Sequence, residues 1–404
     1  MIKPFIIESG SVVLRDRVAQ GSVRFEGGMI SALDGARDGT WVIDGGCMVL
    51  ALALVDIHGD AFEHQLMPLP GVMIPIKAAL LEIDRRLAAN GIATACHTLM
   101  LRWGPGLRSV AIGQAAVATL AALAPRLTDK NHVQLRWETF CFEALPLIEA
   151  ALAGSLLPVL AYNYDTTMWV LHPSVALQDR PFDHAPDFPV VDKDSPAFAA
   201  KMDGRAKRSG MDAADFIALM RQMWERQPEV SAVIAEADRR AAAAGAPMFS
   251  HDDSQPETRD FYRGHGARIS EFPMNMAMSR SAREAGDWIV CGAPNMARGG
   301  SHLGPSGAAD MVAAGLCDIL ASDYYPAILT AVARLEADGI GQLPELWKLV
   351  LTDPAAALGL ADRGEIAVGH RADLVLLDWP EGRTPAVRRC SVRGRGARGA
   401  IAAG

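Results

Sequence analysis

Short, mostly apolar segments alternate with helix-like segments through about 300 residues in the middle of this 404-residue chain. Such alternation is typical of βα units, in which helices connect the neighbouring strands of a parallel sheet. Eight units over this length favour a closed (β/α)8 barrel rather than an open doubly wound sheet. The expected strands span residues 52–57, 93–99, 133–139, 156–161, 247–250, 267–270, 288–291 and 319–321.

Both ends of the chain consist of short strand-like segments separated by turns. These segments lie at residues 11–14, 22–25 and 29–32, and again at 373–377 and 391–393. We therefore predict a small β-sandwich domain assembled from both chain termini, residues 1–52 and 356–404. The barrel would occupy the stretch between them, residues 53–355.

One connection breaks the alternation. Residues 163–210 show little periodicity and contain five prolines, which predicts a long loop. A connection of this length inside a compact domain is usually functional or disordered. A lid over the active site and a solvated surface excursion are therefore the two alternatives for this segment.

The composition excludes several classes of protein. Half of the residues are hydrophobic and 21% are charged, which argues against a disordered chain. The net charge of −8 argues against nucleic-acid binding, and no apolar run approaches the length needed to cross a membrane. No secretion signal is visible, and the six cysteines are scattered without a CxxC pair. We expect a cytoplasmic protein with reduced thiols.

Ligand-type residues follow several of the predicted strands. His58 and Asp60 are two residues apart, so in extended backbone both side chains reach the same side. Glu138, His251 and Asp323 stand at three other strand ends, and the carboxyl ends of barrel strands meet at one rim. Imidazole and carboxylate together suit zinc, manganese or iron. In the alternative reading, the acidic residues only cap the following helices.

The motifs around these residues resemble those of the amidohydrolase superfamily, metal-dependent hydrolases with a barrel and a β-sandwich built from both chain ends. Within it, the chain most resembles the α-D-ribose 1-methylphosphonate 5-triphosphate diphosphatase family of phosphonate metabolism. The resemblance spans nearly the whole chain. The matching segments are VDIHGD (55–60), MPLPG (67–71), SHDD (250–253), EFP (271–273), GAPN (292–295), RGGSH (298–302), DILASDYYP (318–326) and residues 364–375.

The resemblance implies roles for individual residues. Asp323 would also be the catalytic proton shuttle, taking a proton from the attacking water and passing it to the leaving group. Glu138 would bridge the ions if two are present. The metal ligands would be His58, Asp60, Glu138, His251 and Asp323.

A glycine-rich segment is the candidate site for the substrate anion. Glycines let backbone N–H groups approach an oxyanion closely, and an arginine adds fork-shaped donors. A tight turn before a helix is the alternative reading. The substrate-binding candidates are Asn295, Arg298, Gly299, Gly300, Ser301 and His302, together with His64 just beyond the HxD motif.

Two positions depart from the diphosphatase pattern. Asn163 stands where those enzymes usually have a histidine, and an amide oxygen is a poorer zinc ligand than imidazole. Leu69 stands where they have an arginine, and leucine cannot bind phosphate. We therefore expect one tightly bound zinc ion and a weak second one, with manganese and iron as alternatives.

Together these features predict a metal-dependent hydrolase that uses a metal-activated water. The specific expectation is hydrolysis of a phosphorylated riboside, α-D-ribose 1-methylphosphonate 5-triphosphate, to the 5-phosphate and diphosphate. The alternatives are an amidase, deaminase or lactonase acting on a small anionic substrate, and a non-catalytic binding protein with a decayed site. The expected partner is a small anionic, phosphorylated molecule, with neither nucleic acid nor membrane. A homo-oligomer is left open.

Overall fold

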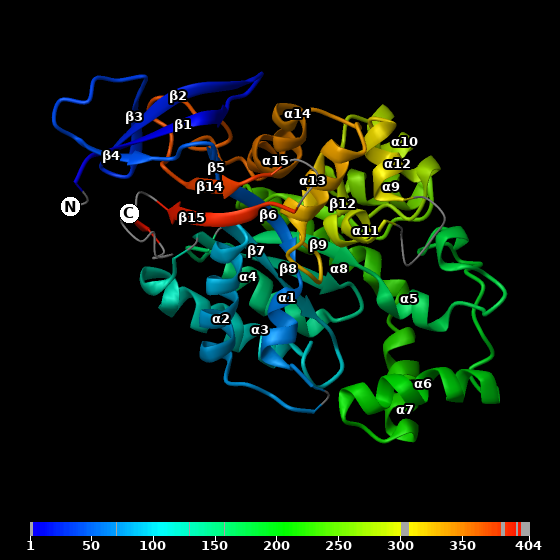
Figure 1. Cartoon of the computed structure of the whole chain (residues 1–404). Helices are drawn as coiled ribbons and strands as arrows, with labels where there is room; N and C mark the ends of the chain where they lie inside the picture. Colours follow the sequence, from blue (N-terminus) through cyan, green and yellow to red (C-terminus); the bar gives the residue numbers. More distant parts are fainter. Residues whose placement is uncertain are drawn as a thin grey trace.

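The computed structural model describes residues 3–69, 71–128, 130–156, 158–299, 307–380, 384–392 and 395–396. Its centre is a sheet of eight strands in which each strand pairs in parallel with the next one along the chain (Figure 1). All eight strands predicted from the sequence are present, and the expected (β/α)8 fold is confirmed. The strands are β6 (Leu54–Gly59), β7 (Ile92–Leu101), β8 (Lys130–Glu138), β9 (Val159–Asn163), β10 (Met248–His251), β11 (Ile269–Glu271), β12 (Trp288–Gly292) and β13 (Ile319–Ala321).

The barrel closes where its first strand meets its last. A parallel bridge pairs Gly59, the end of β6, with Asp323, just beyond β13. Asp323 donates its N–H to the carbonyl of His58 at 2.9 Å, and Asp60 donates to the carbonyl of Asp323 at 2.7 Å. This closure therefore places His58, Asp60 and Asp323 side by side, although Asp323 is more than 260 residues from the other two in the sequence.

Helices cover the outside of the barrel. In α2 (Ile76–Ala89), Leu80, Ile83 and Leu87 form a buried stripe at helical spacing. Gly91 follows with a φ of 76°, a conformation that favours glycine, and turns the chain directly into β7. The remaining helices of the barrel are α1 (Ala61–Leu66), α3 (Val110–Leu123), α4 (Leu145–Leu152), α8 (Gln227–Ala243), α9 (Pro256–Gly264), α10 (Met276–Glu284), α11 (Ala293–Arg298), α12 (Ala308–Ala313) and α13 (Ile328–Ala337).

The two ends of the chain form one second sheet beside the barrel. Strand β5 pairs antiparallel with β14, so that Leu52 lies opposite Leu374. Helices α14 (Leu343–Trp347) and α15 (Asp353–Ala357) lead from the barrel to this sheet. Its strands are β1 (Phe5–Val13), β2 (Val18–Glu26), β3 (Met29–Leu33), β4 (Trp41–Asp44), β5 (Val49–Leu52), β14 (Leu374–Asp378), β15 (Ala386–Val392) and β16 (Arg395–Gly396). The exact domain boundaries stay a prediction.

The segment predicted as a long loop is partly helical. It contains α5 (Asp165–Val170) and α6 (Pro196–Ser209), and α7 (Ala213–Trp224) packs on α6 away from the barrel strands (Figure 1). Pro196, counted in the sequence as an interruption, is the first residue of α6, where a proline needs no N–H partner. Buried side chains such as Phe198, Met202 and Phe216 give this excursion a small hydrophobic core of its own.

Among the described helices, none is both long and apolar enough to cross a membrane.

Candidate metal centre and active site

The ends of β6 and β13 bring together His58, Asp60 and Asp323. One donor atom from each of these three side chains lies within 4.8 Å of the others. His58 lies on β6, and Asp60 follows the end of that strand directly, at the N-terminus of α1. Asp323 joins them through the backbone bridge that closes the barrel. This arrangement is the one expected from the strand-end positions in the sequence.

A second group of donors shares His58 and adds His251 and Glu271, from the ends of β10 and β11. The His58 imidazole Nδ1 lies 2.8 Å from Oε1 of Glu271, which also accepts a hydrogen bond from Gln134 at 2.7 Å. The other carboxylate oxygen, Oε2, lies 4.0 Å from Nε2 of His251. Glu271 was not singled out as a ligand in the sequence, although it opens the EFP motif and ends an apolar strand. A carboxylate on one imidazole nitrogen orients the other nitrogen toward a metal ion.

Three donor atoms at this point are buried without a hydrogen-bond partner within the described part of the chain. They are Nε2 of His58, Nε2 of His251 and Oε2 of Glu271. Leaving a buried polar atom unsatisfied costs about 1–3 kcal/mol, so three in one place require an explanation. A divalent metal ion supplies it, because imidazole nitrogens and carboxylate oxygens are its usual ligands. His58, His251 and Glu271 therefore offer the kind of donor atoms that a divalent metal ion requires.

Burial and charge perturb the same residues. Burial raises the pKa of Asp323 to about 6, although the nearby His58 lowers it. Burial by itself would lower the pKa of His58, but Glu271 and Asp60 outweigh it and raise that pKa well above its usual value. Strong pKa shifts of this kind are typical of functional sites.

The backbone is strained at the same rim. Asp252, Phe272 and Asp323 have φ values of 59°, 54° and 51°, in the left-handed region that favours glycine. Each follows the end of a barrel strand by one or two residues, and Phe272 packs against the rings of both His58 and His251. Left-handed backbone at non-glycine residues clusters at active sites, where the surrounding structure holds it in place.

Glu138 is not brought into either donor group. Its Oε1 accepts a hydrogen bond from the N–H of Thr166 at 3.3 Å, and its Oε2 accepts one from the side-chain amide of Asn163 at 3.4 Å. Burial raises the pKa of Glu138 to about 6. The bridging role implied by the resemblance therefore stays a prediction for this residue.

Arg136, which was not predicted, also reaches the centre. It alternates with Gln134 and Glu138 along β8, so the three side chains share the inner face of the strand. Its guanidinium donates to Oδ1 of Asn163 at 3.1 Å and lies 3.5 Å from Oδ2 of Asp60. A charged residue inside a strand gives no sign in the sequence of which groups on other strands it will contact.

The predicted substrate residues are only partly described. Gly292, at the end of β12, lies between two of the candidates. A Cβ atom placed there would be 3.3 Å from Oδ2 of Asp323 and 3.6 Å from Nδ2 of Asn295. Arg298 is the last residue of α11, and Gly299 ends that helix with a φ of 80°. His64 is exposed on α1. Gly300, Ser301 and His302 lie outside the described residues.

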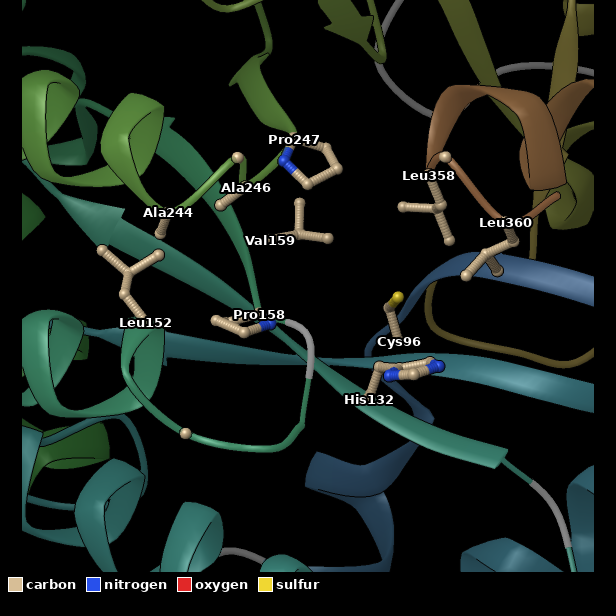
Figure 2. A pocket seen from close by; sticks show the side chains of 13 residues that line it. Cys96, His132, Leu152, Pro158, Val159, Ala244, Ala246, Pro247, Leu358 and Leu360 are labelled. Atoms are coloured by element: carbon tan, nitrogen blue, oxygen red, sulfur yellow. The ribbon is translucent and has the colours of Figure 1, made fainter.

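A cavity of about 300 Å³ lies at the other end of the barrel (Figure 2). It is lined by Pro158 and Val159 at the start of β9 and by Pro247 before β10, with His132 and Cys96 on neighbouring strands. The catalytic candidates lie at the opposite ends of these strands. This cavity is therefore distinct from the candidate metal centre.

Comparison with known proteins finds similar proteins along nearly the whole chain. No protein-family model matches the chain. The α-D-ribose 1-methylphosphonate 5-triphosphate diphosphatase of Escherichia coli is 29% identical over 399 residues, covering 92% of this chain and 94% of that enzyme. An adenosine deaminase from Xanthomonas campestris with bound zinc has the same fold, with a TM-score of 0.61 and 14% identity over 97% of this chain and 92% of that one. The resemblance to the diphosphatase that the sequence predicts is therefore confirmed.

Two further relatives extend the comparison. An N-acetyl-D-glucosamine-6-phosphate deacetylase from Mycobacterium smegmatis has a TM-score of 0.56 and 14% identity over 98% of this chain and all of that one. An adenine deaminase of Methylobacterium is 47% identical over 76 residues, which is 19% of this chain and 13% of that protein. The expectation that the chain is a metal-dependent hydrolase is confirmed.

Proposed function

We propose that this enzyme hydrolyses a small phosphorylated substrate, most specifically α-D-ribose 1-methylphosphonate 5-triphosphate, to the 5-phosphate and diphosphate. The observation that carries the proposal is the convergence of His58, Asp60 and Asp323 at the rim of the barrel. The diphosphatase of E. coli, similar over 92% of this chain, supports the choice of substrate.

The residues divide the chemistry between them. His58, Asp60, His251 and Asp323 would hold one ion, for which zinc is the proposed metal. When bound, the ion would lower the pKa of a water molecule and polarise the scissile bond. Asp323 has a pKa near 6 before any ion binds, so it can exchange a proton close to neutral pH. It would accept the proton of the attacking water and return it to the leaving oxygen.

Arginines near the rim suit an anionic substrate. Arg102 follows β7 and pairs with Asp165, while Arg108 binds Glu63 through two nitrogens, the shorter contact being 2.7 Å. Guanidinium groups already held by carboxylates are fixed in position and offer their remaining donors to phosphate oxygens. Arg298, at the end of α11, would add a further donor near Asn295.

The test is a hydrolysis screen of the purified protein with zinc and with manganese. Phosphorylated ribosides, including the 5-triphosphate, are compared with N-acyl amides, lactones and adenine, and diphosphate release is measured directly. We expect diphosphate release from the triphosphate and none from an Asp323→Asn preparation made in parallel. Turnover of only amides, lactones or adenine would overturn the proposed substrate and leave the hydrolase class intact.

An amidase or deaminase is the second candidate. The observation that favours it is the 76-residue segment shared at 47% identity with an adenine deaminase. Leu69 is exposed and cannot bind phosphate, which also favours a substrate other than a triphosphate. The same screen decides between the two, because a deaminase would release ammonia from adenine without releasing diphosphate from the riboside. A non-catalytic binding protein would turn over none of these compounds.

A further inference from the structure

The guanidinium of Arg136 lies among the donors that a second metal ion would need. In a two-metal site of the kind that the resemblance implies, those donors would be His251, the residue at position 163 and Glu138. Arg136 Nε donates to the amide oxygen of Asn163 at 3.1 Å, and Nη2 lies 3.3 Å from Nδ1 of His251. Nη1 lies 3.5 Å from a carboxylate oxygen of Asp60. One buried positive charge thus contacts donors from three different strand ends.

Asn163 completes this arrangement. Its oxygen is occupied by Arg136, and its NH₂ group donates to Glu138 at 3.4 Å. A histidine that gave one ring nitrogen to an ion would have one nitrogen left, which could accept from Arg136 or donate to Glu138 but could not do both. Arg136, Asn163 and Glu138 therefore form one hydrogen-bonded unit inside the barrel, which depends on the amide of Asn163 both accepting and donating.

Asp252 and Arg136 both lie next to Nδ1 of His251. The carboxylate of Asp252 lies 3.1 Å from Nδ1 of His251 and can only accept, so it favours the tautomer with the proton on that nitrogen. Arg136 is a donor only, so it cannot form a hydrogen bond with the same protonated nitrogen. Nε2 of His251 is then left as a lone pair facing Glu271, 4.0 Å away, on the side of His58.

We propose that Arg136 restricts the centre to one metal ion by holding a fixed positive charge where a second ion would bind. The inference rests on the proposed metal-dependent function. A cation so close to Asp60, Asn163 and His251 repels a divalent ion. It also occupies the amide oxygen of Asn163, which the ion would need as a ligand. The single ion is held by the donors on the other side, around His58.

The experiment measures metal stoichiometry rather than turnover. Wild-type protein and three variants are dialysed against buffered zinc and their metal content is determined, and each is titrated with Co²⁺ while its visible absorption is followed. Arg136→Met removes the charge with little change in length, and Arg136→Lys keeps the charge. Arg108→Met is the matched control, because it removes a nearby rim arginine that binds Glu63 instead of the metal donors.

We expect one ion per chain in the wild type, in Arg136→Lys and in Arg108→Met, and two in Arg136→Met. The second Co²⁺ should bind Arg136→Met on the order of 100-fold more tightly than any second ion binds the wild type. A folded Arg136→Met protein that takes up one ion overturns the inference, and so does a wild type that retains two. If Arg136→Met does not fold, Arg136→Gln carries the same expectation. A wild type that binds no ion would contradict the proposed function instead.

Discussion

Asp323 combines three properties at one position. Its backbone closes the barrel by hydrogen bonding to both sides of Gly59, and its φ of 51° turns the side chain away from the strand direction. Burial raises its pKa to about 6, which is close to the value that suits a proton shuttle near neutral pH. The same residue therefore links the topology of the barrel to the proposed chemistry.

Replacing Asp323 with asparagine tests the shuttle. The amide has nearly the same shape but cannot accept a proton, so kcat should fall by about 10²–10⁴-fold. The fold and at least part of the metal content should be retained, as measured by circular dichroism and metal analysis. Asp338→Asn changes an exposed aspartate in the same part of the chain. It is the control and should leave kcat unchanged. A near wild-type rate for Asp323→Asn would remove this residue from the mechanism.

Replacing Glu271 with glutamine tests the orientation of His58. Glutamine keeps the size but loses the charge that holds the imidazole nitrogen at 2.8 Å. Loss of such a supporting carboxylate typically weakens metal affinity by about 10–100-fold. Zinc affinity measured by competition with a chelator gives the answer, with the exposed Glu257→Gln as control. Equal affinities in the wild type and Glu271→Gln would show that Glu271 only fills space.

The residues that the sequence identified are those marked by their position. His58, Asp60, His251 and Asp323 are polar residues at the ends of apolar strands, and the barrel brings such ends together. Arg136 lies two residues before the end of β8, and its role depends on contacts with three other strands. Such contacts are fixed by the register between strands, which no local pattern encodes. The difference between the predicted and observed positions of Glu138 has the same origin.

At the scale of elements, periodicity predicts the strands but not the excursion after β9. Barrel strands are buried on both faces and appear as short apolar runs bounded by glycine and polar residues. In the excursion, five prolines obscure the pattern, although one of them begins α6. Its few large apolar residues, such as Phe198 and Phe216, pack mainly in a cluster of their own, which meets the barrel side at Trp103 after β7. A separate small core leaves a weak periodic signal.

The excursion should therefore unfold separately from the barrel. Replacing the fully buried Phe198 with alanine removes the centre of its core, a change that typically costs about 3–5 kcal/mol. Amide hydrogen exchange should accelerate in α6 and α7 and stay slow in β6–β13. Phe182→Ala, a half-buried residue of the same segment, should have a much smaller effect. Uniform acceleration across the barrel would show that the excursion folds as part of it.

At the scale of the whole molecule, the proposed metal ligands come from both ends of the barrel sheet. His58 lies on the first strand and Asp323 follows the last, with His251 on a strand between them. An ion held by these residues connects the two strands whose pairing closes the barrel. Binding to the folded state alone stabilises that state in proportion to the logarithm of ligand concentration over Kd. Zinc should accordingly raise the temperature of unfolding.

This stabilisation should grow with pH between about 5.5 and 8, because protons and the ion compete for the same donors. In the metal-free fold, the pKa of His58 is raised well above 6.5 and that of Asp323 is raised to about 6. A raised pKa means that the fold binds the proton more tightly than the unfolded chain, so both groups stabilise the metal-free fold at low pH and cease to do so as pH rises. Metal-free protein should therefore lose stability over this range through these groups, while zinc-bound protein should not. Unfolding temperatures measured with zinc and with chelator should differ little at pH 5.5 and most at pH 8. A difference that is the same at both pH values would show that the ion binds without displacing these protons, and therefore not at His58 and Asp323.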